Sequence, residues 1–198
     1  MVSFKKGILI FCTLILSSCF IIGCTNSNNE QEQEQKLKND YLLEINNGTR
    51  FFKSEVVPKS ESEEVILDSF KVQINDDYDK FKEIYIDSET FNYYPKLYKE
   101  NLSKGLYTEE ITIHNLVKLN EDDYSNESNG LKYYYFMDEL KKYNPYEFEI
   151  IEVNYTIKLT DELNQSAQWG NGNWIRYFVV VKENKNSDWR IFDVYGHM

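Results

Sequence analysis

The fold of this chain is decided by one stretch, WIRYFVVVK at residues 174–182. Its β-branched and aromatic residues favour a strand. Successive side chains of a strand point to opposite faces, and here both sets are largely apolar. One set is Ile175, Tyr177, Val179 and Val181, and the other is Trp174, Arg176, Phe178 and Val180. We therefore expect a strand that is covered on both faces and central in its sheet.

Further strands are predicted on both sides of this stretch. Residues 146–160 alternate, and their apolar set lies on one face: Ile151, Val153, Tyr155, Ile157 and Leu159. A shorter strand is predicted at Trp189–Tyr195, and another from Glu109 towards Leu119. Residues 120–130 are predicted as a loop. Residues 131–143 fit a helix or an aromatic strand, and the charged pairs at 138–139 and 141–142 favour the helix.

The segment before these strands has helical periodicity. Ser60 or Ser62 can cap a helix that runs to Asn75, and a short second helix follows Asp76-Asp77. A third helix is predicted over 91–103, starting after Ser88 and with Pro95 as its weak point. Helices followed by strands predict an α+β fold, in which N-terminal helices pack on a curved antiparallel sheet.

The first 23 residues have the layout of a secretory signal peptide. Lys5 and Lys6 precede an uncharged apolar run, residues 7–22, which is shorter than the roughly 20 residues of a membrane-spanning helix. The run ends in Ile21-Ile22-Gly23-Cys24, which resembles the lipobox of bacterial lipoproteins. The resemblance implies cleavage between Gly23 and Cys24, lipid on Cys24, and attachment to the outer face of the cytoplasmic membrane. The alternative is an uncleaved membrane anchor.

A polar segment follows the cysteine. Residues 25–40 read TNSNNEQEQEQKLKND, in which Leu37 is the only large apolar residue. Such a segment cannot bury enough apolar surface to order itself. We expect a signal peptide at 1–23, the lipidated cysteine and a flexible polar tether at 24–59, and an α+β domain at 60–198. Residues 41–58 fit either a short hairpin about Asn46-Asn47-Gly48 or further tether.

Composition excludes thiol chemistry in the mature domain and argues against nucleic-acid binding. Cys12 and Cys19 lie in the leader and Cys24 is expected to carry lipid, so the mature domain has no free thiol for a disulfide, a nucleophile or a thiolate metal site. Without Lys5 and Lys6, the chain has 20 basic and 33 acidic residues, a formal charge of −13. Such a surface repels nucleic acid, and we expect no nucleic-acid partner.

The second half of the chain resembles a known superfamily. The residues that carry the resemblance are two long strands and a closing tryptophan strand: Tyr155-Thr156-Ile157, Tyr177-Phe178-Val179-Val180-Val181 and Asp188-Trp189-Arg190-Ile191-Phe192-Asp193-Val194. With the preceding helices, this order is similar to the cone-shaped fold of nuclear transport factor 2-like proteins, and to uncharacterised members found in lipoproteins. The resemblance covers about Ser60 to Met198 and implies a pocket enclosed by the cone. It assigns no catalytic residue, because no position matches residue by residue.

The sequence yields one candidate contact site. Trp169 and Trp174 flank a glycine- and asparagine-rich segment that is predicted to be a hairpin tip, and Arg176 shares the face of Trp174. An aromatic pair at a loop can stack on a ligand or dock to a partner, and the alternative is that it folds back onto the sheet. The expected function is a surface-anchored, non-catalytic module that binds an unknown small ligand or a surface protein.

The alternative function is an enzyme that uses carboxylate and tyrosine acid–base chemistry in the cone pocket. Glu152, Asp193 and Tyr155 are its candidate residues. A deep cavity that holds a buried carboxyl beside a tyrosine would favour the enzyme, and a cavity filled by aliphatic side chains would favour the module. His114 and His197, the only histidines, are far apart in sequence, so we expect no metal site, and no motif indicates a cofactor.

Overall fold

The structure is a computed structural model that describes residues 43–125 and 134–196. Residues 41–198 form one compact unit that contains all of the described core. The expected signal peptide, Cys24 and the 25–40 tether lie outside the described residues, as does His197.

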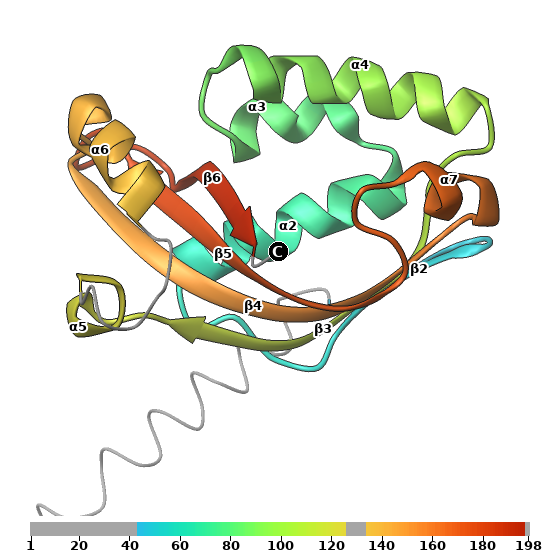
Figure 1. Ribbon diagram of the computed structural model, residues 1–198, viewed down its shortest axis with the longest axis horizontal. Helices are drawn as coiled ribbons and strands as arrows, with labels where there is room; N and C mark the ends of the chain where they lie inside the picture. The colour runs from blue at the N-terminus through green and yellow to red at the C-terminus, as the bar shows by residue number, and fades with distance from the viewer. Residues whose placement is uncertain (1–42, 126–133, 197–198) are drawn as a thin grey trace, which may run out of the picture. The chain divides into compact units, whose positions relative to one another are not determined.

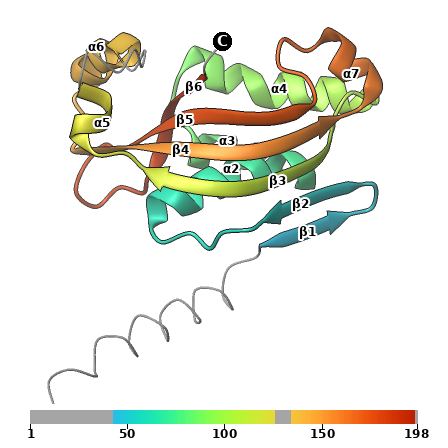
Figure 2. The same cartoon turned by 60° about the horizontal axis from the view of Figure 1, so that its bottom comes forward.

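A six-stranded sheet forms the centre of this unit, with the strands in the order β1-β2-β3-β4-β5-β6 (Figures 1 and 2). Their bounds are Glu44–Asn47, Arg50–Ser54, Thr108–Lys118, Glu147–Leu159, Gly172–Lys182 and Arg190–Gly196, respectively. The expected strands at 109–119, 146–160, 174–182 and 189–195 are therefore present. The hairpin about Asn46-Asn47-Gly48 forms as well, and it extends the folded unit to residues before 60.

The sheet is mixed, which corrects the expected antiparallel arrangement. β2 runs parallel to β3, whereas all other neighbouring pairs are antiparallel. A parallel pair needs a long crossover connection, and here that connection carries the N-terminal helices. The antiparallel prediction failed because the 41–58 segment was not placed in the sheet.

These helices begin and end at residues that the sequence marks. Ser60 caps α2 (Glu61–Asn75), and its Oγ accepts a hydrogen bond from the Glu63 backbone N–H. The helix ends at Asp76, whose backbone is left-handed. A 3-10 turn, η1 (Tyr78–Lys80), leads into α3 (Phe81–Ile84), and Ser88 caps α4 (Glu89–Ser103). The predicted helix–stop–helix order is therefore confirmed.

Three further helices lie between the strands, so the order is not simply helices first. Residues 121–125, expected as loop, form the short helix α5 (Glu121–Ser125), whereas 126–130 lie outside the described residues. The helix predicted at 131–143 is confirmed as α6 (Tyr134–Tyr143) in its described part. The connection between β4 and β5 carries α7 (Asp161–Ser166), so the segment with Trp169 and Trp174 is not a simple hairpin tip.

Core residues pack on both faces of the sheet. α2 and α3 contribute Ile66, Phe70 and Phe81 to a large cluster on one face, where they meet Phe178 and Val180 of β5. Leu140 of α6 belongs to a second cluster with the alternate β5 residues Tyr177, Val179 and Val181. β5 is therefore covered on both faces and paired on both edges, as its sequence predicts.

The long strands curve around the helices. Extra residues interrupt the pairing of β3 with β4 at Glu109 and His114, and the pairing of β5 with β6 at Phe192. Such bulges bend a strand and increase its twist. Figure 1 shows β3, β4 and β5 curving beneath α2, with α3 and α4 on the same concave side. The candidate site lies on this concave side.

Candidate functional site

A pocket of about 480 Å³ lies between the concave face of the sheet and the helices α2 and α4. Ligand pockets typically have volumes of about 300–1,000 Å³. Aromatic rings form much of its wall, and its lining side chains come from both halves of the chain: Ser69, Phe70, Gln73, Tyr85, Thr90, Phe91, Tyr94, Leu97, Tyr98, Tyr155, Ile157, Gln168, Trp169, Trp174, Arg176, Phe178, Asp193 and Val194. The cavity is therefore not filled by aliphatic side chains.

One wall is made by the Trp loop, residues 164–174. The indole rings of Trp169 and Trp174 meet edge to face, with centroids 5.3 Å apart. The Trp174 Nε1–H donates to the Gly170 carbonyl at 2.9 Å. Asn164 Oδ1 accepts a hydrogen bond from the Asn171 backbone N–H at 2.7 Å. Residues 167–171 of this loop have no regular structure, whereas its ends belong to α7 and β5. These bonds fix the irregular part, so both indoles are held in place before any ligand arrives.

Gly170 is the position where this loop has no room for a side chain. A Cβ there would lie 2.5 Å from Asn164 Oδ1, which is inside van der Waals contact. Glycine is thus required here because the Asn164 side chain approaches the backbone closely. The absence of a Cβ at residue 170 allows Asn164 to reach the Asn171 N–H.

Arg176 brings a positive charge into the aromatic wall. Its guanidinium carbon lies 4.4 Å from the centroid of the Trp169 ring, a cation–π contact. The guanidinium also interacts with the phenol of Tyr155. Among the described residues, no carboxylate forms an ion pair with it, whereas Arg50, for example, pairs with Asp76. Arg176 is therefore a cation without an anionic partner in this part of the chain.

Tyrosines supply neutral hydrogen-bond donors to the same space. Burial raises the pKa of Tyr98 to about 12, and neighbouring phenols add to the shift. Burial also raises the pKa of Tyr155 and of Tyr85. These phenols stay protonated at neutral pH, because the pKa of an exposed tyrosine is already about 10. The pocket is therefore rich in donors.

Asp193 is the only carboxylate in the lining. The bulge at Phe192 precedes it in β6, and bulges often re-aim a side chain beside a site. Its Oδ1 accepts a hydrogen bond from the Val194 backbone N–H at 2.7 Å. Burial raises the pKa of Asp193, with the charge of Glu139 as a smaller cause.

The structure brings together most of the residues that the sequence singled out. Trp169, Trp174 and Arg176 line one pocket, and Asp193 and Tyr155 line it as well. The two tryptophans are half-buried, so they fold back towards the sheet and still face a cavity. Glu152 is not part of the site, because it alternates with Val153 and Tyr155 along β4 and faces the other side of the sheet.

Sequence reasoning missed the helical wall of the pocket. Phe91, Tyr94 and Tyr98 follow one another at spacings of three and four residues, which place them on one face of α4. None of the residues of this helix is fully buried. The signal that could have found them is an amphipathic helix whose stripe is aromatic rather than aliphatic.

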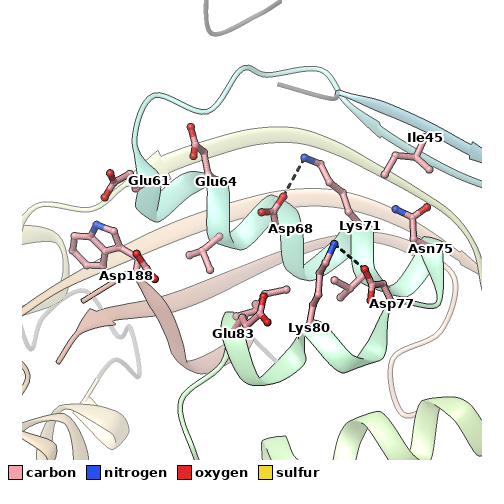
Figure 3. Close-up of a pocket in the computed structure, with 14 residues that line it drawn as sticks. Ile45, Glu61, Glu64, Asp68, Lys71, Asn75, Asp77, Lys80, Glu83 and Asp188 are labelled. Atoms are coloured by element: carbon pink, nitrogen blue, oxygen red, sulfur yellow. Dashed lines mark hydrogen bonds and ion pairs between the residues drawn. The ribbon is translucent and has the colours of Figure 1, made fainter. Parts of the chain in front are cut away.

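A second hollow, of about 500 Å³, lies between α2, α3 and Trp189. It is lined by carboxylates and by two lysines (Figure 3). Lys71 Nζ lies 3.2 Å from Asp68 Oδ1, and Lys80 Nζ lies 2.8 Å from Asp77 Oδ2, so each lysine is paired inside the hollow. Volume does not separate the two hollows. Chemistry does, because both lysines of the acidic hollow are paired, carboxylates outnumber them, and the lining contains one aromatic ring.

The described residues offer neither a metal site nor a membrane-spanning helix. Within residues 43–125 and 134–196, no three histidine, aspartate or glutamate side chains are arranged to hold a metal ion. His114 contacts Glu55 at 2.9 Å and Thr156 at 2.7 Å instead. In the same part of the chain, no helix has the length and apolar character needed to span a membrane.

The fold and the pocket define the class: an α+β domain with an open, mixed sheet and an aromatic cavity on its concave face. The chain belongs to the family described as "Domain of unknown function (DUF4829)", whose model matches residues 63–194, about two thirds of the chain. Every residue that lines the aromatic pocket lies within this match, whereas the β1–β2 hairpin precedes it. No curated protein matches the sequence.

Proposed function

We propose that this protein is a lipid-anchored surface protein whose folded unit binds a small molecule in the aromatic pocket. The single observation that carries the binding function is the open cavity of about 480 Å³, walled by aromatic rings and containing one guanidinium without an anionic partner. Large, largely preformed apolar cavities with a few polar groups are the usual form of small-molecule sites. The fold that we propose is the cone of the nuclear transport factor 2-like proteins. The curved sheet with helices over its concave face supports it.

The binding proposal is tested by the small molecules that purify with the protein. Residues 25–198 would be isolated under native conditions, and bound molecules would be identified by mass spectrometry. Tyr94→Ala removes a ring from the pocket wall, whereas Tyr93→Ala removes the 53 % exposed neighbouring ring. We expect a bound molecule that is retained by Tyr93→Ala and lost from Tyr94→Ala. Equal retention by both variants would place the molecule outside the pocket and contradict the proposal.

The proposed cellular location rests on the expected signal peptide, residues 1–23. Lys5 and Lys6, the uncharged run at 7–22 and Gly23-Cys24 together support export, cleavage before Cys24 and lipid attachment. Metabolic labelling with a palmitate analogue should mark the wild-type protein and Cys19→Ser, but not Cys24→Ser. A Cys24→Ser protein that stays as firmly bound to membranes as the wild type would contradict a lipid anchor.

A second candidate function is acid–base catalysis in the same pocket. It is favoured by Asp193, a carboxyl with a raised pKa in a cavity lined by tyrosines. The cavity meets the criterion for an enzyme only in part, because Asp193 is half-buried rather than buried. We rank catalysis second because no hydrogen bond joins Asp193 to a tyrosine among the described residues, and its Oδ1 already accepts from the Val194 N–H. Asp193→Asn separates the two functions, since it would abolish turnover of a bound molecule and leave its binding largely intact.

A further inference from the structure

We propose that the pocket is selective for flat, largely apolar molecules that carry one carboxylate, and that Arg176 binds this carboxylate. The inference rests on the proposed function and names the chemical class of its ligand. Among the described residues, only two buried side-chain polar atoms have no hydrogen-bond partner, Asn154 Oδ1 and Arg176 Nε. Asn154 alternates with Tyr155 along β4, so only the Arg176 atom belongs to the pocket.

A buried donor without a partner is rare in folded proteins and calls for an explanation. The Nε–H of an arginine and the adjacent terminal N–H form a fork that matches the two oxygens of a carboxylate. Tyr155 interacts with the same guanidinium. The fork is held against Trp169 by the cation–π contact, which orients it before a ligand binds. A carboxylate that binds the guanidinium would supply the missing negative charge. It would also supply the acceptor for Nε after a shift of the side chain, because that atom is closed to solvent here.

The charges around Arg176 favour one negative charge on the ligand rather than two. Arg176 is the only basic residue in the described lining, and Asp193 is the only acidic one. A second negative charge on the ligand would find no further cation there and would share the cavity with the Asp193 carboxyl. The remaining donors are neutral and include the phenols of Tyr98 and Tyr155. The formal charge of the whole chain is −11. Distant surface charges are largely screened at physiological ionic strength, but they still oppose a multiply charged anion on its approach.

The shape of the wall favours a flat body. The ring planes of Trp169 and Trp174 lie at 89° to each other and form a corner. A planar group in this corner can stack on one indole while the other indole contacts its edge. Phe91 and Tyr94 of α4 line the same space from the helical side. The preferred ligand therefore pairs an aromatic or similarly flat body with one terminal carboxylate.

Three probes of similar size and shape differ in charge: 3-phenylpropanoate, 3-phenylpropanamide and 3-phenylpropylamine. Their binding to residues 25–198 would be followed by quenching of tryptophan fluorescence, because two of the three tryptophans lie in the pocket. We expect the carboxylate to bind at least about tenfold more tightly than the neutral amide, and the amine to bind most weakly.

Arg176→Gln should remove the preference for the carboxylate, whereas Arg176→Lys should keep part of it. Arg190→Gln is the matched control, because it removes one positive charge from β6 at a residue that does not line the pocket. Circular dichroism would establish that each variant is folded. Equal binding of carboxylate and amide by the wild type would overturn the inference and leave the binding function standing. Absence of saturable binding by all three probes would count against both.

Discussion

Gly170→Ala is the sharpest test of how the Trp loop is built. The added Cβ would lie 2.5 Å from Asn164 Oδ1, so the Asn164 side chain must turn away and release the Asn171 N–H. A lost hydrogen bond of this kind costs about 1 kcal/mol, and the forced displacement adds a similar amount. Alanine also lowers the entropy of the unfolded chain, which offsets about 0.5 kcal/mol. Gly170 is not among the residues with positive φ, so no backbone strain is added.

The expected net loss is therefore about 1.5 kcal/mol in the free energy of unfolding. With a urea m-value of about 2 kcal/mol/M, the midpoint of urea unfolding should fall by about 0.75 M. Fluorescence should shift as well, because the Gly170 carbonyl accepts from Trp174. The pocket probes should bind more weakly to this variant.

A double-mutant cycle with Asn164→Ala isolates the contact. Without the Asn164 amide, the nearest remaining Asn164 atom is its backbone oxygen at 3.8 Å from the new Cβ, an ordinary contact. Gly170→Ala should then be neutral or slightly stabilising in the Asn164→Ala background. If Gly170→Ala costs the same in both backgrounds, the clash with Asn164 is not the reason for the glycine, and the account of the loop is wrong.

Two further predictions concern titration and helix capping. The pKa of Asp193 is raised in the folded protein above its ordinary value of 3.8. The stability that comes from its protonated form is therefore fully present below pH 3.8. It is lost as the pH rises through the pKa of the folded protein. Asp193→Asn keeps the acceptor for the Val194 N–H, so it should stabilise the protein at neutral pH. Urea unfolding should then show a free energy of unfolding that depends less on pH between acid and neutral conditions. An unchanged pH dependence would refute the raised pKa of Asp193. Ser60→Ala and Ser88→Ala each remove an N-cap hydrogen bond, to Glu63 and Phe91, and each should lower the free energy of unfolding by about 1 kcal/mol in the same assay. Both helices line the pocket, but the N–H that Ser88→Ala frees belongs to the lining residue Phe91, whereas Glu63 does not line it. The Ser88 variant should therefore weaken probe binding more than the Ser60 variant, and equal effects on binding would contradict this reasoning.

Local physical chemistry made much of the fold predictable. Ser60, Ser88 and Asp76 mark helix ends because side-chain oxygens satisfy free backbone N–H groups and aspartate tolerates a left-handed backbone. The strand at 174–182 was predictable because alternation reports directly which faces are buried. These features depend on residues only a few positions apart.

The β1–β2 hairpin shows where local reasoning ends. Its turn is visible in Asn46-Asn47-Gly48, but the parallel pairing of β2 with β3 joins residues more than fifty positions apart. No local pattern encodes such a partner, because hydrogen bonds between strands are made by the backbone and not by particular side chains.

By itself, the sequence determined the helix caps and the strand alternation, and it predicted five residues that line the candidate pocket: Trp169, Trp174, Arg176, Asp193 and Tyr155. Only the tertiary structure decided that these residues face Tyr94 and Tyr98 of α4 and Asp193 of β6 across one cavity. It also decided that Glu152 lies outside the cavity. The physical reason is that bulges set the curvature of the sheet, and curvature sets which side chains from distant segments converge.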